Sequence, residues 1–203
     1  MDEVLIVPTG TANVASVCAA FDRLGVRQRI CSDPAQVASA PAVVLPGVGA
    51  FAAAADCLDA LGLREVLRER MQAQQPTLAI CLGMQLLCAS SDESPGVEGL
   101  SVVPQSVTSF TCDLPVPQVG WNRVEPIGSG LLKEGYAYFV NSYRLTEIPS
   151  GWAGAVTDYG GLFVSALERG PLLACQFHPE ISGAYGEALL ARWLSRAEEA
   201  SSC

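Results

Sequence analysis

Short strand-like runs alternate with helical segments through the first half of the chain, and this alternation constrains the fold more than any other feature. The first apolar run, at 4–7, suits a strand buried on both faces. The pattern predicts strands at 4–7, 26–31, 42–46 and 77–81, and helices at 12–24, 51–74 (broken near Gly62) and 83–90. Strands that alternate with helices in this way predict an α/β fold with a parallel, doubly wound sheet.

The second half of the chain has a different pattern, because proline and glycine become frequent after about Ser91. Turns separate apolar runs there, which predicts strands at 100–104, 106–110, 118–126, 136–144, 153–159, 162–168 and 172–177. A last helix is expected at 186–200, with five apolar residues on its inner face: Ala188, Leu189, Leu190, Trp193 and Leu194. We therefore expect one domain over 1–203, a mostly parallel sheet flanked by helices with an antiparallel portion from the second half.

Composition and charge exclude several classes of protein. Half of the residues are hydrophobic and 16% are charged, which is enough apolar material for a sizeable core. The net charge is −9 and no Lys/Arg cluster is present, so neither a nucleic-acid groove nor an anionic membrane surface is an expected partner. No signal-peptide pattern and no apolar run of membrane-spanning length occurs. We expect a cytoplasmic protein.

The eight cysteines form no CxxC pair, and one histidine is available to assist them in metal binding. They are Cys18, Cys31, Cys57, Cys81, Cys88, Cys112, Cys175 and Cys203. Neither a metal site nor a disulfide framework is expected from this arrangement. For seven of the eight, the expected state is a reduced thiol in apolar surroundings.

Cys81 differs from the other cysteines because it stands between a predicted strand and a predicted helix. Gly83 follows it and Ala79 precedes it, so small residues flank a sharp turn that lifts the thiol clear of the sheet. The helix N-terminus favours a thiolate, and the N–H of Leu82 points toward a developing oxyanion. A buried cysteine at the end of a core strand explains the same residue almost equally well.

The base that a cysteine nucleophile needs is most often a histidine, and the chain contains only His178. Glu180 lies two residues later, on the same side of an extended His-Pro-Glu segment, and Pro179 favours that extended backbone. Glu180 is thus placed to hold the imidazole in one tautomer and to favour its protonated form. A lone histidine beside a solvated glutamate is the alternative, which the pairing with Cys81 disfavours.

A third candidate segment, Pro46-Gly47-Val48-Gly49, follows the third predicted strand. The carboxyl ends of strands in a doubly wound sheet meet at the edge where ligands bind. Two glycines permit a tight backbone whose N–H groups face a substrate oxygen. An ordinary turn between strand and helix is the alternative explanation.

These motifs together resemble those of a known family. “AICLGMQLL” at 79–87 and “QFHPE” at 176–180 form the signature pair of class I, triad-type glutamine amidotransferases, and “LPGVGAF” at 45–51 is a third match. The narrower resemblance is to the glutaminase subunits of imidazole glycerol phosphate synthases, through “TGTANVASV”, “LPGVGAF”, “CLGMQLL”, “VPQVGWNRV”, “YAYFVNSYR” and “FHPEISG”. It covers essentially the whole chain and implies that family's flavodoxin-like α/β fold.

The resemblance implies a role for each matching residue. Cys81 attacks the carboxamide of glutamine, His178 moves the proton and Glu180 orients His178. The N–H groups of Leu82 and Val48 form the oxyanion hole, the latter after a peptide flip within 46–49. The glutamine pocket uses Gly47, Gly49, Gln85, Glu93, Asn141, Ser142 and Tyr143. No cofactor is implied.

The same resemblance implies a partner, a (β/α)₈ cyclase subunit that receives the ammonia and forms imidazole glycerol phosphate and aminoimidazole carboxamide ribonucleotide in histidine biosynthesis. Four residues then lie at or near the interface of this heterodimer: Asn13, Trp121, Asn122 and Tyr138. A core position for Trp121 is an equally weighted alternative. The family commonly has histidine at Gln118 and Asn141, glycine at Ala79 and an acidic or small residue near Pro8. Gln118 and Asn141 are expected between the glutamine pocket and the cyclase face, and they leave open whether communication between the subunits follows the family's usual pattern.

Other functions stay open at this point. A glutaminase subunit that serves anthranilate, aminodeoxychorismate or pyridoxal phosphate synthesis is the alternative within the family, and “GWN” and “YFVNSY” disfavour it. A cysteine peptidase or deglycase on a related fold is disfavoured by Gln85 and the His-Pro-Glu step. A regulatory binding protein that kept the fold is disfavoured by the intact Cys81, His178 and Glu180.

Overall fold

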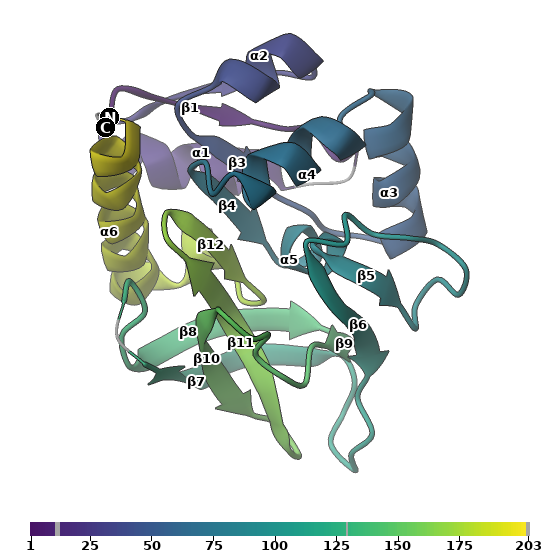
Figure 1. Ribbon diagram of the computed structural model, residues 1–203. Helices are drawn as coiled ribbons and strands as arrows, with labels where there is room; N and C mark the ends of the chain where they lie inside the picture. Colours follow the sequence, from purple (N-terminus) through teal and green to yellow (C-terminus); the bar gives the residue numbers. More distant parts are fainter. Residues whose placement is uncertain (11–12, 129, 202–203) are drawn as a thin grey trace.

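A large mixed sheet dominates the computed structural model, which describes residues 1–10, 13–128 and 130–201 (Figure 1). Nine strands lie in the order β2-β1-β3-β4-β12-β11-β10-β7-β8. Their bounds are β1 Glu3–Ile6, β2 Arg27–Ile30, β3 Val43–Leu45, β4 Thr77–Ile80, β7 Gln118–Ile127, β8 Gly135–Asn141, β10 Ala153–Asp158, β11 Leu162–Arg169 and β12 Leu172–Cys175. A smaller sheet, β5-β6-β9, contains β5 Cys88–Ser91, β6 Val103–Ser109 and β9 Tyr143–Arg144.

The pairing of the strands confirms the predicted division of the sheet. Strands β2, β1, β3, β4 and β12 pair in parallel, whereas β11, β10, β7 and β8 continue the sheet with antiparallel pairs. The parallel half therefore comes from the first 80 residues and β12, and the antiparallel half from the second part of the chain.

Helices cover both faces of the parallel half. The helices are α1 Val14–Arg23, α2 Pro34–Ser39, α3 Phe51–Ala60, α4 Arg64–Gln72, α5 Leu82–Leu86 and α6 Gly183–Ser201, with a 3₁₀ turn η1 at Pro179–Ile181. Ile6 belongs to the same hydrophobic cluster as Phe21 of α1 and Trp193 of α6, whereas its neighbour Leu5 belongs to a second cluster that contains Phe51 of α3. Because successive side chains of a strand point to opposite faces, this alternation confirms a doubly wound sheet.

The centre of the parallel half positions the candidate site. β4 lies between β3 and β12 and pairs in parallel with both. The carboxyl ends of these three strands lead into 46–49, Cys81 and 176–178, which the topology brings to one edge of the sheet although they are far apart in the sequence.

The segment after Cys81 differs from the prediction of a helix over 83–90. Helix α5 ends at Leu86, and β5 follows it. The carbonyl oxygen of Leu86 accepts a hydrogen bond from Leu100 N–H (2.6 Å), and that of Leu87 accepts one from Val102 N–H (2.9 Å). Tertiary pairing with a distant segment therefore replaces the helical hydrogen bonds that the sequence pattern favours.

Other predictions need smaller corrections. The expected strands 100–104 and 106–110 form one strand, β6, and the expected strand 136–144 divides into β8 and β9. Helix α2 was not predicted, although Asp33 is a recognisable cap whose side chain accepts from Gln36 N–H. Ala188 is exposed on α6 instead of facing inward. Ala12, expected within the first helix, lies outside the described residues.

No helix within residues 1–10, 13–128 and 130–201 combines the length and the apolar character that a membrane crossing requires.

A buried arginine ties α4 to the end of α2 and the start of β4. Arg70 is 2% exposed. Its guanidinium donates to four carbonyl oxygens, those of Val37 (3.0 Å), Ala38 (3.1 Å), Ala40 (2.8 Å) and Pro76 (3.0 Å). Burial lowers the pKa of Arg70 to about 10, so the side chain stays charged at neutral pH.

Replacing this arginine tests how much the contact stabilises the fold. In Arg70→Met the four carbonyl oxygens lose the guanidinium, although that of Pro76 keeps a backbone donor, Val43 N–H (3.1 Å), and we expect a loss of roughly 2–4 kcal/mol of unfolding free energy. Urea denaturation followed by circular dichroism measures it. Arg196→Met, which removes only an exposed ion pair with Glu199, is the control and should shift stability by less than about 0.5 kcal/mol. Equal midpoints for the two variants would contradict this role.

Candidate active site

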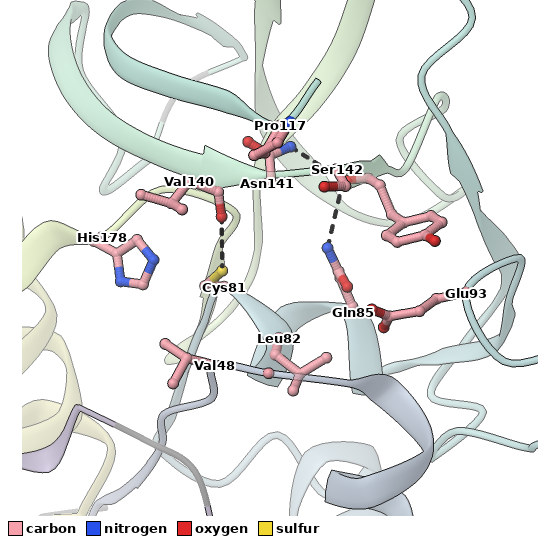
Figure 2. A pocket seen from close by; sticks show the side chains of 12 residues that line it. Val48, Cys81, Leu82, Gln85, Glu93, Pro117, Val140, Asn141, Ser142 and His178 are labelled. Carbon is pink, nitrogen blue, oxygen red and sulfur yellow. Dashed lines mark hydrogen bonds between the residues drawn. The ribbon is translucent and has the colours of Figure 1, made fainter. Parts of the chain in front are cut away.

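A pocket of about 240 Å³ opens at the carboxyl edge of the sheet, and most of the predicted site residues line it (Figure 2). Its walls come from the segments after β3, β4 and β12, from the end of β8 and the residues that follow it, from the loop after β5 and from the residue before β7. The lining residues are Val48, Gly49, Cys81, Leu82, Gln85, Glu93, Pro117, Val140, Asn141, Ser142, Tyr143 and His178. Gly47 does not line it, although Val48 does.

Cys81 stands at the corner between β4 and α5, in the sharp turn that the sequence predicts. Its φ of 53° lies in the left-handed region, which a residue with a side chain rarely adopts. Its backbone N–H donates to Cys175 O of β12 (2.7 Å) and fixes the corner. A Cβ at Gly83 would lie 2.1 Å from Leu45 O, so the close approach of α5 to β3 requires glycine there. These constraints hold the Cys81 side chain at the pocket wall.

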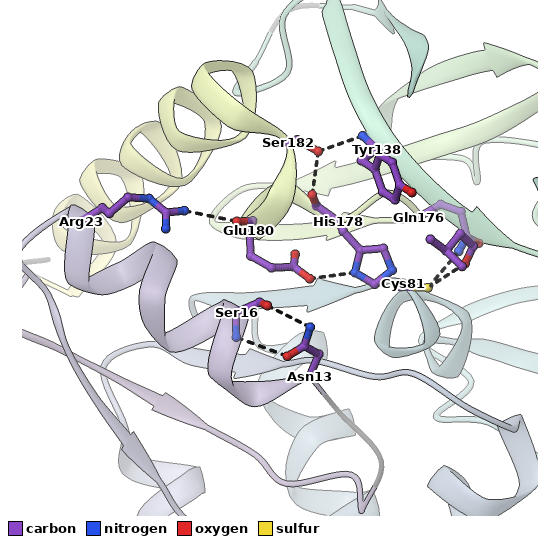
Figure 3. Close-up of polar contacts among 10 residues, drawn as sticks. Asn13, Ser16, Arg23, Cys81, Tyr138, Gln176, His178, Glu180 and Ser182 are labelled. Atoms are coloured by element: carbon purple, nitrogen blue, oxygen red, sulfur yellow. Dashed lines mark hydrogen bonds and ion pairs between the residues drawn. The ribbon is translucent and has the colours of Figure 1, made fainter. Parts of the chain in front are cut away.

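His178 and Glu180 form a buried pair at the same end of the pocket (Figure 3). Nδ1 of His178 lies 2.7 Å from Oε1 of Glu180, and the two residues are 6% and 5% exposed. The predicted extended backbone holds at His178 only, because Pro179–Ile181 forms a 3₁₀ turn that Ile181 N–H closes onto His178 O (3.2 Å). The turn, and not an extended step of two residues, brings the carboxylate back to the imidazole.

Ser182 anchors this turn to β8. Its hydroxyl donates to His178 O (2.6 Å) and accepts from Tyr138 N–H (2.9 Å). The N–H of His178 donates in turn to Tyr138 O (2.9 Å). On the other side, Arg23 of α1 donates to Glu180 O (3.2 Å). The pair is therefore held from two elements that come from different parts of the sequence.

The surroundings of His178 favour its protonated form. Burial lowers the pKa of this imidazole, but its hydrogen bonds to Cys81 and to Glu180, with the negative charge of both, outweigh burial and raise the pKa to about 10. The second carboxylate oxygen of Glu180 is buried and has no hydrogen-bond partner among the described residues. An unshared carboxylate of this kind strongly favours imidazolium.

The two predicted oxyanion donors are not arranged as a hole in this conformation. Leu82 N–H donates to Gly47 O at 3.3 Å. A trans peptide directs its N–H and C=O to opposite sides, so the N–H of Val48 faces away from the position that Gly47 O occupies. A turn of the Gly47–Val48 peptide would release Leu82 N–H and present Val48 N–H beside it.

Glu93 and Gln85 lie on the wall of the pocket away from His178. Oε2 of Glu93 accepts a hydrogen bond from the N–H of Phe51 (2.7 Å), which is the first residue of α3. The residue before it, Ala50, has no side chain that could cap the helix. Nε2 of Gln85 donates to Tyr143 O (3.4 Å). Glu93 thus keeps acceptor capacity toward the pocket while it holds α3 in place.

Three pocket contacts were not predicted from the sequence. Pro117 and Val140 line the cavity, and Val140 O accepts from the Cys81 thiol at 3.7 Å. Gln176 lies behind Cys81, with its Nε2 3.7 Å from Cys81 Sγ. A signal for Gln176 was present, because it lies two residues before His178 in the “QFHPE” segment and extended residues at that spacing share a side.

Gln118 and Asn141, where the family commonly has histidine, are opposite each other on β7 and β8. They are 2% and 5% exposed, and the side-chain oxygen of each is buried with no hydrogen-bond partner among the described residues. Asn141 lines the pocket and its Nδ2 donates to Tyr143 O (3.0 Å). Neither amide titrates near neutral pH.

The outward side of the β7–β8 hairpin is apolar and exposed. Trp121 is 56% exposed, so a core position for it is wrong, and its ring meets that of Tyr138 edge to face at 5.9 Å. Val119 and Val140, paired next to them, are also exposed. We name these four residues the outer hairpin face.

The other two predicted interface residues have structural partners. Asn122 Nδ2 donates to Asp158 O of β10 (2.8 Å), and its Oδ1 accepts from Arg123 N–H (2.7 Å). Asn13 caps α1, because its side chain accepts from Ser16 N–H (3.3 Å). Neither belongs to the outer hairpin face.

The other cysteines differ from Cys81 in their surroundings. The cysteines of the described ranges are free thiols, and Cys203 lies outside those ranges. Burial raises the pKa of Cys88 to about 12. The pKa of Cys175 is also raised, mainly by burial and in addition by the negative charges of Glu180 and Glu168. Among the described residues, no three His, Cys, Asp or Glu side chains gather in a way that would hold a metal ion.

Comparison with known proteins identifies the family of the chain. The family model “Glutamine amidotransferase class-I” matches residues 10–197. Two similar curated proteins are both “Imidazole glycerol phosphate synthase subunit HisH”. That of Deinococcus radiodurans is 43% identical, over 94% of this chain and 92% of its own, and that of Symbiobacterium thermophilum is 42% identical, over 95% and 93%.

Solved structures with low sequence identity share the fold. A crystal structure of a glutamine amidotransferase has a TM-score of 0.77 at 18% identity, over 96% of this chain and 98% of that one. A glutamine amidotransferase from Methylobacillus flagellatus has a TM-score of 0.64 at 15% identity, over 96% and 94%. With the family model and the curated relatives, these findings place the chain in the class-I glutamine amidotransferase family, within the group of imidazole glycerol phosphate synthase HisH subunits.

Proposed function

We propose that this protein hydrolyses glutamine to glutamate and ammonia with Cys81, His178 and Glu180, as the glutaminase subunit of imidazole glycerol phosphate synthase in histidine biosynthesis. One observation carries the proposal: a thiol held at a strained corner shares a pocket with a buried imidazole–carboxylate pair. We further propose that residues 1–203 are one glutamine amidotransferase domain and that the protein is cytoplasmic.

In the proposed reaction, Cys81 Sγ gives its proton to His178 and attacks the carboxamide carbon of glutamine. Because Nδ1 of His178 is held by Glu180, Nε2 is the nitrogen that exchanges this proton. The C=O electron pair moves onto oxygen and a tetrahedral oxyanion forms. As the oxyanion collapses, the C–N bond breaks, His178 protonates the leaving nitrogen and ammonia departs, which leaves a γ-glutamyl thioester.

Water completes the cycle. His178 takes a proton from a water molecule that attacks the thioester carbon, the C–S bond breaks and glutamate leaves while Cys81 recovers its proton. The raised pKa of His178 suits the first half of this cycle, because it favours transfer of the Cys81 proton to Nε2, and the imidazolium formed in this way then protonates the leaving nitrogen. Glu180 stabilises the positive charge each time it forms.

The oxyanion needs donors that the resting conformation does not yet supply. Gly47 O occupies the Leu82 N–H (3.3 Å), so we propose that the Gly47–Val48 peptide turns when the enzyme becomes active. Leu82 and Val48 then donate together to the oxyanion. Because the oxyanion hole forms only on activation, the isolated subunit is expected to hydrolyse glutamine slowly.

The proposed partner is the (β/α)₈ cyclase subunit, which docks on the outer hairpin face. This face borders the pocket, because Val140 belongs to both. Tryptophan and tyrosine are enriched in the core of protein interfaces, and Trp121 is 56% exposed on this face. HisH relatives at 38–43% identity favour this acceptor over the anthranilate, aminodeoxychorismate or pyridoxal phosphate alternatives.

The direct test is glutamate release by this chain alone, with the cyclase subunit, and with the cyclase subunit and its nucleotide ligand. We expect slow release by the isolated chain and strong stimulation in the liganded complex. Co-purification of the two subunits should depend on the outer hairpin face and weaken in Trp121→Ala. Full activity of the isolated chain would contradict the coupled-subunit proposal.

A further inference from the structure

Two buried amide side chains connect the Gln85 wall of the pocket to the cysteine sulfur. Nε2 of Gln85 lies 3.0 Å from Oε1 of Gln176, and Nε2 of Gln176 lies 3.7 Å from Sγ of Cys81. Gln176 is 1% exposed and Gln85 is 6% exposed. A glutamine buried this fully is costly unless its amide is used, which makes its position behind the thiol significant (Figure 3).

The direction of the chain follows from hydrogen-bond chemistry. Gln85 Nε2 also faces Tyr143 O (3.4 Å), and a backbone carbonyl can only accept, so the nitrogen of Gln85 must be the atom that faces it. That same nitrogen then donates to the oxygen of Gln176. The remaining amide group of Gln176, its NH₂, is therefore the one directed at Cys81 Sγ.

The sulfur of Cys81 therefore contacts both a hydrogen-bond acceptor and hydrogen-bond donors. Val140 O, at 3.7 Å, can only accept and so favours the protonated thiol. Gln176 Nε2 can only donate and so favours the thiolate, as does a protonated His178. A donor beside a buried sulfur stabilises negative charge that apolar surroundings would otherwise disfavour.

We propose that Gln176 is a further catalytic residue, whose amide donates a hydrogen bond to the Cys81 thiolate and is held in that direction by Gln85. Gln85 is then a positioning residue that links the pocket to the nucleophile, because its side chain also lines the pocket. The inference deepens the proposed function and rests on it for its catalytic meaning. Its first consequence, a larger thiolate fraction at Cys81, is measurable without any substrate.

The test is the rate at which iodoacetamide alkylates Cys81 in the full chain, followed by peptide mass spectrometry from pH 6 to 10. In Gln176→Met, which keeps the length of the side chain and removes its hydrogen bonds, we expect alkylation at neutral pH to slow about tenfold. The pH profile should move to higher pH. An unchanged rate and profile would overturn the proposal.

Two internal controls keep this test decisive. The peptides that contain the buried Cys88 and Cys175 should stay unlabelled, which reports that each variant is folded. Ser165 is a neighbour of Gln176, because its carbonyl oxygen accepts from the backbone N–H of Gln176 (2.9 Å). Ser165→Ala removes its buried hydroxyl and should leave the pH profile of Cys81 alkylation unchanged. A shift as large in Ser165→Ala would assign the effect to packing and overturn the proposal.

A double-mutant cycle tests the role of Gln85. Gln85→Met should slow Cys81 alkylation in the wild-type background but not in Gln176→Met, because it acts through Gln176. Additive effects would overturn the linkage. Glutamate release by the wild-type complex is measured in parallel. If the wild-type complex releases no glutamate, the proposed function is contradicted. If it releases glutamate but the alkylation profile of Cys81 is unchanged in Gln176→Met, only the role of Gln176 is contradicted.

Discussion

Replacing Cys81 with alanine is expected to reduce glutamate release by the liganded complex about 10³-fold or more, with little change in folding or in cyclase binding. The reason is that the variant removes the sulfur on which the thioester forms and leaves the His178–Glu180 pair (2.7 Å) intact. The measurement is the initial rate of glutamate production at saturating glutamine.

The matched control is Cys88→Ala, seven residues later in the same stretch of sequence. Cys88 is 1% exposed, and burial raises its pKa to about 12, so it is a packing thiol. This variant should keep near-normal activity and lose about 1 kcal/mol of stability. Unchanged activity in Cys81→Ala, or an equal loss in Cys88→Ala, would refute the assignment of the nucleophile.

Replacing Glu180 with glutamine is expected to lower the pKa of His178 and to reduce glutamate release by roughly 10²- to 10⁴-fold. The carboxylate is one of the groups that outweigh burial and raise this pKa to about 10. Because His178 is the single histidine of the chain, one imidazole resonance in an NMR titration gives its pKa without any assignment problem.

The same change has a consequence for stability. A histidine whose pKa is raised from 6.5 to about 10 on folding contributes stability that is fully present below pH 6.5 and is lost as the pH rises toward 10. The stability difference between wild type and Glu180→Gln should therefore shrink across that interval. If His178 titrates at the same pH in both proteins, Glu180 does not set its charge.

The sequence is informative about the site because the residues that build it follow strand ends. The apolar runs predict β1, β3 and β4, and the alternation with helices predicts which strand ends meet. Local pattern and topology therefore suffice to bring Cys81 and the 46–49 segment to one edge of the sheet. His178 follows by elimination, since the chain has no other histidine.

Features that depend on long-range pairing were not predictable in this way. The residues after Leu86 have helical character, but their carbonyl groups pair with residues near 100–103 and form a strand. The turn of Pro179–Ile181 likewise depends on Ser182 and β8. Ser182 directly follows the turn, but its hydrogen bond to Tyr138 of β8 is not visible in the local sequence, and neither is the pairing with residues near 100–103.

The side-chain partners of the site also escaped prediction. The sequence places Gln176 beside His178 but gives no sign that its amide faces sulfur, because that depends on the carbonyl of Tyr143, far earlier in the chain. The orientation of the Gly47–Val48 peptide is a property of the backbone that no residue type specifies. Such details are fixed by three-dimensional contacts alone.

The most direct test of Cys81 as the nucleophile is labelling with a diazoketone analogue of glutamine, in which the diazo carbon takes up the thiol proton and the sulfur then displaces N₂ to form a stable thioether. We expect modification of Cys81 alone among the eight cysteines of the chain, in the complex and with protection by glutamine. Modification of another residue, or modification of Cys81 that glutamine does not slow, would contradict it.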